Sequence, residues 1–181
     1  MMQDFHRDSS AGVLQGQYDA QFEAVVEAFA HNFESQGEVG ASLCITLEGE
    51  AVVDLWGGVK DPKEQTPWES DTLAVIFSST KGLVALAAHT LIAQGKLDIE
   101  APVADYWPEF AQNGKHNLTV RELLSHQSGL CGIEQPLTVE DLYDWDKIIG
   151  LLETQRPLWS PGTMAGYHAV TWGYLCGELI H

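Results

Sequence analysis

Ser78 and Lys81 are the two residues whose types and spacing could carry out nucleophilic chemistry. They lie in the run Ser78-Ser79-Thr80-Lys81, which fits the pattern S-x-x-K. If Ser78 opens a helix, a residue three positions later lies on the same helix face and its amine reaches the hydroxyl. The positive end of the helix dipole also stabilises negative charge that develops on the serine oxygen. The spacing therefore predicts a serine nucleophile activated by a lysine.

A simpler interpretation of the same run is a serine that caps a helix, followed by a solvated lysine. On the four residues alone this interpretation is favoured, because S-x-x-K occurs on many exposed helices. The surroundings favour chemistry instead. Residues 79–94 are mostly apolar and predict a helix buried on all sides, which would desolvate Lys81 as a base requires. Lysine is also scarce, since Lys and Arg together number only 9 of 181 residues.

The hydrophobic pattern predicts the elements that position these residues. Residues 42–47 and 51–56 are rich in β-forming residues and predict a hairpin, with residues 48–50 as its turn. Thr119 and Glu122 have capping-box spacing ahead of a short helix, which Gly129 closes. Further helices are expected at residues 18–36, 138–154 and 164–180, and residues 98–118 form a polar connection.

Two features predict that the chain is an N-terminal part of a larger fold. The length of 181 residues suits one domain or part of a two-part fold. About two convincing strands are present, and a lone hairpin is marginal by itself. The sequence also stops at His181 inside an apolar helical run. We therefore expect further strands beyond His181, and expect the chain to associate, either as a homo-oligomer or with its missing C-terminal part.

The composition of the chain limits which binding partners are expected. The formal net charge of −17 repels nucleic acid and anionic membranes, so neither is an expected partner. The polar N-terminal segment has no apolar core of a secretory signal, so a cytoplasmic location is predicted. Cys44, Cys131 and Cys176 are widely separated and are expected to be reduced, with Cys44 packed in the core. The histidines have no metal-binding spacing, and neither a metal nor a cofactor is predicted.

Three stretches, in order, resemble the β-lactamase-related serine hydrolases, which include class C β-lactamases, DD-peptidases and family VIII carboxylesterases. They are TLAVIFSSTKGLVALAAHTLIAQGKLDIEAPVADYWPEF, LTVRELLSHQSGL and WSPGTMAGYHAVTWGYLCGELI. The resemblance covers most of residues 18–181. It implies an α/β (α+β) fold in which an antiparallel sheet, flanked by helices, lies beside a mostly helical region. Residues 1–75 would begin the sheet region with a helix and a hairpin, and residues 76–181 would form the serine helix and the helical region.

The same resemblance implies a role for three residues. Ser78 would be the acylated nucleophile, Lys81 would help remove its proton, and Tyr167 would be a second proton shuttle. Without the resemblance, Tyr167 would be interpreted as a core tyrosine of an amphipathic helix. These enzymes have a late strand that supplies one donor of the oxyanion hole, and Trp56-Gly57-Gly58 comes too early in the chain to be that strand. The chain alone is therefore expected to hold only part of the active site and to be inactive or weakly active by itself.

The sequence departs from the β-lactamase pattern at Ala169, where class C enzymes have an asparagine that contacts the amide side chain of β-lactams. This departure argues against β-lactam hydrolysis and brings the segment closer to the family VIII esterases. The predicted function is therefore hydrolysis of short-chain carboxylic esters, with a small-molecule ester as partner. A β-lactamase or DD-peptidase and a non-catalytic assembly protein are the alternatives. His126 and His168 are expected to be structural.

Overall fold

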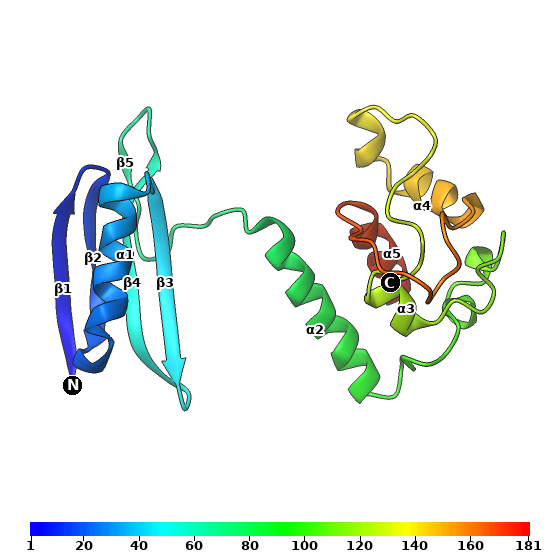
Figure 1. Cartoon of the computed structure of the whole chain (residues 1–181), viewed down its shortest axis with the longest axis horizontal. Coiled ribbons are helices and arrows are strands. Elements are labelled where there is room, and N and C mark those ends of the chain that lie inside the picture. The colour runs from blue at the N-terminus through cyan, green and yellow to red at the C-terminus, as the bar shows by residue number, and fades with distance from the viewer. The chain divides into compact units, whose positions relative to one another are not determined.

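The computed structural model describes every residue from Met1 to His181. The chain divides into two compact units, Met1–Val75 and Ile76–His181, and each unit has its own hydrophobic core. Figure 1 shows the strands in the first unit and most of the helices in the second. None of the helices is long and apolar enough to cross a membrane.

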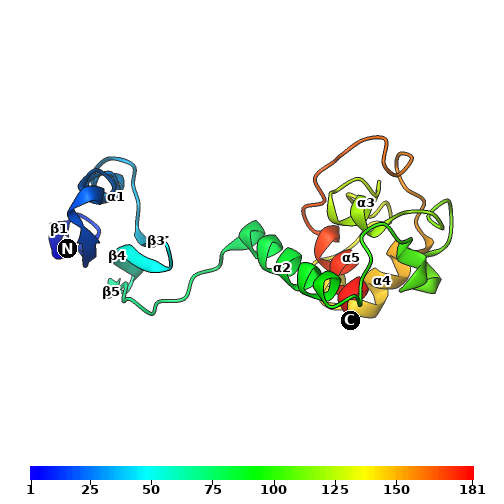
Figure 2. The same ribbon diagram turned by 90° about the horizontal axis from the view of Figure 1, so that it is seen from below.

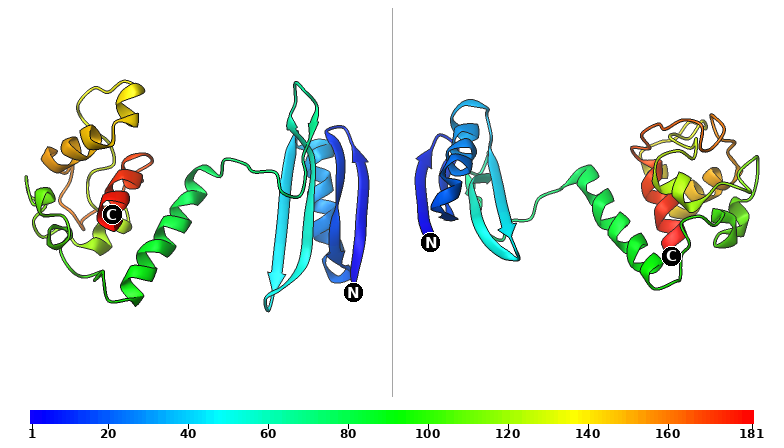
Figure 3. Two further views of the ribbon diagram at one scale, coloured as in Figure 1. Left: turned by 180° about the vertical axis from the view of Figure 1, so that it is seen from behind. Right: turned by 60° about the horizontal axis from the view of Figure 1, so that its bottom comes forward.

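The first unit is an antiparallel sheet with one helix on one face. Its strands are arranged in the order β1-β2-β4-β3, and the short strand β5 pairs with β4. Helix α1 lies across the sheet (Figure 1), and the left panel of Figure 3 shows that no element of this unit covers the opposite face. The element bounds are β1 Met2–Ser9, β2 Gly12–Asp19, α1 Glu23–Ser35, β3 Gly40–Leu47, β4 Glu50–Asp61 and β5 Thr66–Pro67.

Alternating side chains build the core of this unit. On β4, Val53 and Leu55 are fully buried beneath α1, whereas Asp54 between them is exposed. Helix α1 contributes the buried side chains of Phe29 and Phe33, whose ring centroids lie 5.2 Å apart. Burial of each such side chain stabilises the unit by roughly 1.5–3 kcal/mol.

The expectation of only about two convincing strands was wrong. β1 and β2 form a second hairpin, and β2 pairs with β4, so that Tyr18 lies opposite Val53. The expected helix at residues 18–36 accordingly begins only at Glu23. The strand signal of β2 is weak in sequence because Gln15, Gly16 and Gln17 separate its apolar residues. The conformation of β2 is decided by its pairing with β4, a strand that lies much later in the sequence.

Cys44 is also placed differently from expectation. Its side chain is exposed, whereas its neighbours Leu43 and Ile45 pack against the core beneath α1. Successive side chains of a strand point to opposite faces of a sheet, so Cys44 lies on the face that α1 does not cover. Because the run around Cys44 is apolar throughout, the sequence did not show which side chains point to which face of the sheet.

Gly57 and Gly58 in the Trp56-Gly57-Gly58 segment are required by close backbone packing. Gly58 has φ +82°, and a Cβ atom there would lie 2.8 Å from Cε1 of Phe33 and overlap the carbonyl oxygen of Val39. A Cβ on Gly57 would lie 2.6 Å from Cα of Leu14. This segment therefore serves the packing of β4 against its neighbouring strands and α1.

We expect Gly58→Ala to destabilise the first unit by more than about 2 kcal/mol, because it combines a left-handed φ with an unavoidable clash. Gly49→Ala is the matched control. Gly49 lies in the β3–β4 turn at φ +89°, and a Cβ atom there would meet no other atom within 4 Å. Its replacement should cost only the backbone strain of roughly 1 kcal/mol. Amide hydrogen exchange of the β4 residues measures both effects, and equal losses would contradict the packing explanation.

The second unit is mostly helical. Its α-helices are α2 Thr80–Ala93, α3 Val120–Leu124, α4 Trp145–Thr154 and α5 Thr171–Ile180, and single 3₁₀ turns occur at Phe77–Ser79, Val103–Asp105, Pro108–Phe110 and Glu140–Tyr143. The helices surround a core that includes the fully buried side chains of Phe110, Leu123, Leu130, Ile148, Leu152 and Leu175.

Two expected helices of this unit begin later than predicted. The helix expected from residue 138 is interrupted at Asp144, whose extended backbone and side-chain bond to the Lys147 N–H cap α4. The helix expected from residue 164 begins only at Thr171. The segment before it, which contains Tyr167, is an irregular loop. The first difference arises at a capping position, where a local side-chain hydrogen bond competes with helix propagation.

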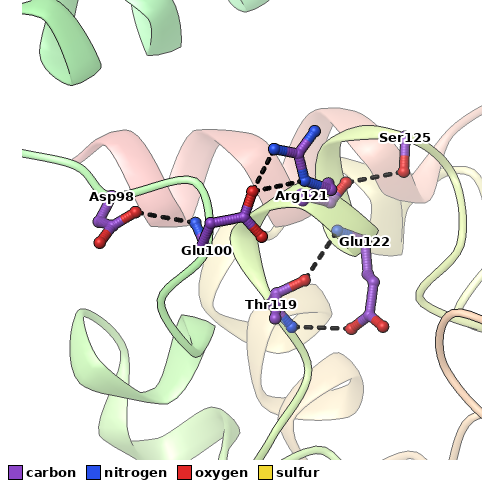
Figure 4. Close-up of polar contacts among 6 residues, drawn as sticks. All are labelled: Asp98, Glu100, Thr119, Arg121, Glu122 and Ser125. Atoms are coloured by element: carbon purple, nitrogen blue, oxygen red, sulfur yellow. Dashed lines mark hydrogen bonds and ion pairs between the residues drawn. The ribbon is translucent and has the colours of Figure 1, made fainter.

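The predicted capping box at the start of α3 is confirmed. The Thr119 Oγ1 atom accepts a hydrogen bond from the Glu122 N–H at 3.2 Å, and a Glu122 carboxylate oxygen accepts one from the Thr119 N–H at 2.9 Å. Figure 4 shows these contacts together with the ion pair between Arg121 and Glu100. The Ser125 hydroxyl donates to the Arg121 carbonyl oxygen at 2.7 Å and closes the helix. This network holds the turn that follows α3, which contains His126.

Within its own unit, helix α2 packs through one face only, whereas its composition predicted burial on all sides. Leu83 and Leu86 are 61% and 64% exposed, and Ala88 is the one fully buried residue of the helix. Val84, Leu91 and Ile92 are partly buried against the core of the unit. Figure 2 shows α2 at the border of its unit. The apolar helix α2 therefore has one packed face and one face that no other element of the same unit covers.

Candidate active site

Ser78 and Lys81 meet at the start of α2. Ser78 lies in the 3₁₀ turn Phe77–Ser79, and Lys81 occupies the first turn of the α-helix that follows. Lys81 Nζ donates a hydrogen bond to Ser78 Oγ at 3.3 Å. The capping position of α2 is occupied by Ser79, which makes no side-chain capping bond. Ser78 is therefore oriented toward Lys81 and does not cap the helix.

Tyr167 reaches the same hydroxyl from the loop before α5. Its phenol oxygen donates a hydrogen bond to Ser78 Oγ at 2.6 Å, although the two residues are 89 positions apart in sequence. The residue is 57% exposed, which is inconsistent with its interpretation as a core tyrosine. The structure thus brings Ser78, Lys81 and Tyr167 together around one oxygen atom.

A backbone carbonyl completes the contacts of the lysine. Lys81 Nζ donates to the carbonyl oxygen of Ala169 at 3.1 Å and lies 5.0 Å from the centroid of the Tyr167 ring. None of the four ion pairs in the structure involves Lys81. Its charge is therefore directed at the serine and the tyrosine without a neutralising carboxylate. Sequence reasoning could not identify the Ala169 carbonyl, because every residue carries one.

The electrostatics of the site act on Tyr167. The hydrogen bond with Ser78 lowers the pKa of the Tyr167 phenol, and the hydrogen bond and charge of Lys81 lower it further. A tyrosine needs such a shift to act as a proton acceptor near neutral pH, because its ordinary pKa is about 10. The arrangement can therefore take a proton from Ser78 and return it to a leaving group.

The backbone around Ser78 is strained and open. Phe77 has φ +43°, an unfavourable left-handed conformation for a residue with a side chain. Such strain is found at functional sites where the surrounding structure enforces it. The Ser78 N–H has no acceptor among the backbone hydrogen bonds, whereas the next N–H, of Ser79, donates to Ile76 O at 3.0 Å. One backbone donor is thus available beside the serine hydroxyl.

His168 lies beneath the site, where it serves the structure. Its side chain is fully buried, its Nε2 atom is 2.7 Å from Ser128 Oγ, and its Nδ1 atom contacts the Gly166 carbonyl oxygen. Burial lowers the pKa of its imidazole. His168 makes no hydrogen bond to the Ser78, Lys81 or Tyr167 side chains. No group of three or more His, Cys, Asp or Glu residues in the structure could hold a metal ion.

The fold and this site match a known family. The family model described as Beta-lactamase matches residues 22–181. The chain therefore belongs to the β-lactamase family, and it has the β-lactamase and DD-peptidase type of fold, with an antiparallel sheet and helices. This result agrees with the resemblance seen in the sequence.

Comparison with individual relatives narrows the class of protein within this family. The chain is 41% identical over 167 residues to the esterase/β-lactamase LipL of Mycobacterium tuberculosis, covering 91% of this chain and 38% of that protein. A crystal structure of a family VIII carboxylesterase has a TM-score of 0.88 and 49% identity, over 92% of this chain and 45% of that one. A penicillin-binding protein homologue from Caulobacter crescentus has a TM-score of 0.89 and 44% identity, over the same shares. The chain thus spans less than half the length of these relatives.

Proposed function

We propose that the protein is a serine hydrolase that cleaves carboxylic esters, in particular short-chain esters, through an acyl-enzyme on Ser78. The observation that carries the proposal is the convergence of a phenol and an ammonium group on one hydroxyl. Tyr167 lies 2.6 Å and Lys81 3.3 Å from Ser78 Oγ. The similarity to a family VIII carboxylesterase supports the ester as the substrate class.

In the proposed acylation step, Ser78 Oγ attacks the ester carbonyl carbon as its proton passes to the Tyr167 phenolate. In that form of the site, the serine hydroxyl donates the hydrogen bond and the phenolate accepts it. The positive charge of Lys81 stabilises the phenolate. The Ser78 N–H at the start of α2 is one donor for the developing oxyanion. The alkoxide then leaves as an alcohol, taking its proton from Tyr167.

Deacylation follows by the same groups in reverse. A water molecule gives a proton to Tyr167 and attacks the acyl carbon; the bond from the acyl carbon to Ser78 Oγ then breaks, the acid leaves, and Tyr167 returns the proton to Ser78 Oγ. No cofactor takes part in this scheme. The lysine remains charged throughout and holds the tyrosine through electrostatic attraction, with the Ala169 carbonyl at 3.1 Å fixing the position of its ammonium group.

A β-lactamase or DD-peptidase is the second candidate. The name of LipL includes β-lactamase as well as esterase, and the Caulobacter protein is a penicillin-binding protein homologue. Ala169 speaks against it, since a methyl group cannot donate a hydrogen bond to the amide side chain of a β-lactam. A non-catalytic protein built on the family fold is a third candidate, and the hydrogen-bonded trio speaks against it.

The proposal is tested by reacting the protein with a fluorophosphonate probe and by comparing hydrolysis of p-nitrophenyl butyrate with that of nitrocefin. We expect phosphonylation of Ser78 in the intact chain, mapped by peptide mass spectrometry, and turnover of the butyrate ester well above that of nitrocefin. Faster nitrocefin turnover would favour the β-lactamase. An unlabelled Ser78 in a folded protein would favour the non-catalytic candidate.

The lowered pKa of Tyr167 leads to a pH prediction. Phosphonylation of Ser78 should accelerate as pH rises and reach half of its plateau rate below pH 10, because the phenolate is the proton acceptor and its pKa lies below the ordinary value of 10.0. In Tyr167→Phe the rate should fall by roughly 10²–10⁴-fold, the usual contribution of a general base, and this pH dependence should disappear. Tyr143→Phe is the control, because Tyr143 is 85% exposed and its hydroxyl makes no hydrogen bond to another residue. An unchanged pH profile in Tyr167→Phe would contradict the assignment.

A further inference from the structure

We propose that His126 is a positioning residue for Tyr167, which it holds by accepting hydrogen bonds from the residues on both sides of the tyrosine. The inference rests on the proposed function, because it concerns how Tyr167 is aimed at Ser78. His126 lies in the turn after α3, and Tyr167 lies in the loop before α5. The two segments are therefore joined at the point where the site needs a fixed geometry.

The two hydrogen bonds bracket Tyr167. The Gly166 N–H donates to the backbone carbonyl oxygen of His126 at 3.0 Å. The His168 N–H donates to Nδ1 of the His126 imidazole at 3.2 Å. The peptide groups on either side of the tyrosine are thus anchored to a single residue. With both peptides held, the Tyr167 side chain has little backbone freedom with which to move away from Ser78.

The ring of His126 also supports the tyrosine ring. Their centroids lie 5.0 Å apart at an interplanar angle of 50°, and the Trp172 ring lies 5.8 Å from His126 on a tilted plane. Aromatic pairs at such distances attract each other beyond the area that they bury. His126 therefore constrains Tyr167 through its backbone carbonyl, its ring nitrogen and its ring face.

This role requires one protonation state of the imidazole. Nδ1 accepts the His168 N–H only if it carries no proton, so the neutral ring must hold its hydrogen on Nε2. The titratable side chains that face His126 are Lys81, Tyr167 and His168. Partial burial lowers the pKa of His126 below 6.5, and the positive charge of Lys81 lowers it further. The ring is therefore neutral at neutral pH, which keeps the acceptor in place.

The backbone of His126 suits it to a specific test. Its φ is +64°, a region that asparagine tolerates better than most residues. The side-chain oxygen of asparagine can also replace Nδ1 as an acceptor. His126→Asn therefore keeps the hydrogen bond and the strained backbone, but it does not titrate. His126→Phe keeps an aromatic ring at the same φ but has no acceptor.

We expect His126→Phe to lower kcat for p-nitrophenyl butyrate by roughly 10–100-fold with KM nearly unchanged, as small displacements of a reacting group do. His126→Asn should restore most of this loss. Protonation of Tyr167 lowers the rate at acid pH in every variant; the further fall that accompanies protonation of His126 should be absent from His126→Asn. If His126 served folding alone, both variants would contain less active protein. Their kcat values would then not differ in this way, and their pH profiles would be unchanged.

Nuclear magnetic resonance gives a readout that is independent of turnover. We expect the His126 ring to carry its proton on Nε2 at neutral pH, and the His168 amide to exchange about ten-fold faster in His126→Phe, as for loss of one hydrogen bond. A proton on Nδ1 would overturn the inference, as would equal rates of phosphonylation in His126→Phe and the unchanged protein. Those outcomes leave the proposed function intact, whereas an inert Ser78 in the unchanged protein would overturn both.

Discussion

Replacing Ser78 with alanine is expected to abolish ester turnover, with kcat falling by roughly 10⁴-fold or more, as for removal of the nucleophile in other serine hydrolases. Ser78 Oγ is the one atom that receives hydrogen bonds from both the Tyr167 phenol and the Lys81 ammonium group. Without it, no acyl-enzyme forms and Tyr167 has no serine hydroxyl from which to take a proton. Initial rates with p-nitrophenyl butyrate measure the loss.

Ser79→Ala is the matched control for this experiment. Ser79 is the adjacent serine at the start of α2, and its hydroxyl makes no capping hydrogen bond. Its replacement should leave turnover and fluorophosphonate labelling close to those of the unchanged protein. Thermal unfolding of both variants separates chemistry from folding, because each removes only one exposed hydroxyl. Retained activity in Ser78→Ala would disprove the assigned nucleophile.

Lys81→Met is expected to lower kcat by roughly 10²–10⁴-fold, the range for loss of a general base, because the Tyr167 phenolate then lacks the charge that stabilises it. Methionine retains most of the length of the side chain but removes the charge that faces Tyr167 and the hydrogen bonds to Ser78 Oγ and Ala169 O. The pKa of Tyr167 should rise as a result, because Lys81 contributes to its lowering. The plateau of the pH–rate profile should therefore move to higher pH.

The control for this change is Lys96→Met. Lys96 is exposed beyond the end of α2 and takes part in no ion pair. This variant has the same change of net charge but should have unchanged kcat and an unchanged profile. Ultraviolet titration of the five tyrosines offers a second measurement. The pKa of Tyr167 should rise in Lys81→Met and stay unchanged in Lys96→Met. An unchanged rate in Lys81→Met would exclude the lysine from the mechanism.

The exposed face of α2 illustrates where sequence patterns were insufficient. The composition of residues 79–94 is apolar on all sides, and burial on all sides was the natural expectation. Within the second unit Leu83 and Leu86 are exposed, because α2 contacts its own unit through one face. Hydrophobicity indicates that a surface favours burial, but which element covers it depends on the arrangement of the whole fold. Our expectation that the chain associates through such surfaces stays a prediction.

The sequence by itself determined the local features of this protein. S-x-x-K places a lysine beside a serine because a helical turn brings positions three apart together. The capping box and the β3–β4 hairpin likewise depend on residues within a few positions of each other. Hydrogen bonds and contacts of this short range follow from residue type and spacing, so they could be predicted.

Only the tertiary structure decided the long-range features. Tyr167 lies 89 residues from Ser78, and its role was inferred from family resemblance while its own surroundings favoured a core tyrosine. Contacts between residues far apart in sequence also decide the formation of strand β2 and the exposure of Cys44. The same holds for the hydrogen bonds between His126 and the loop that contains Tyr167. Packing selects one arrangement among many that local preferences permit, and it places the phenol on the serine hydroxyl that the sequence had already set beside its lysine.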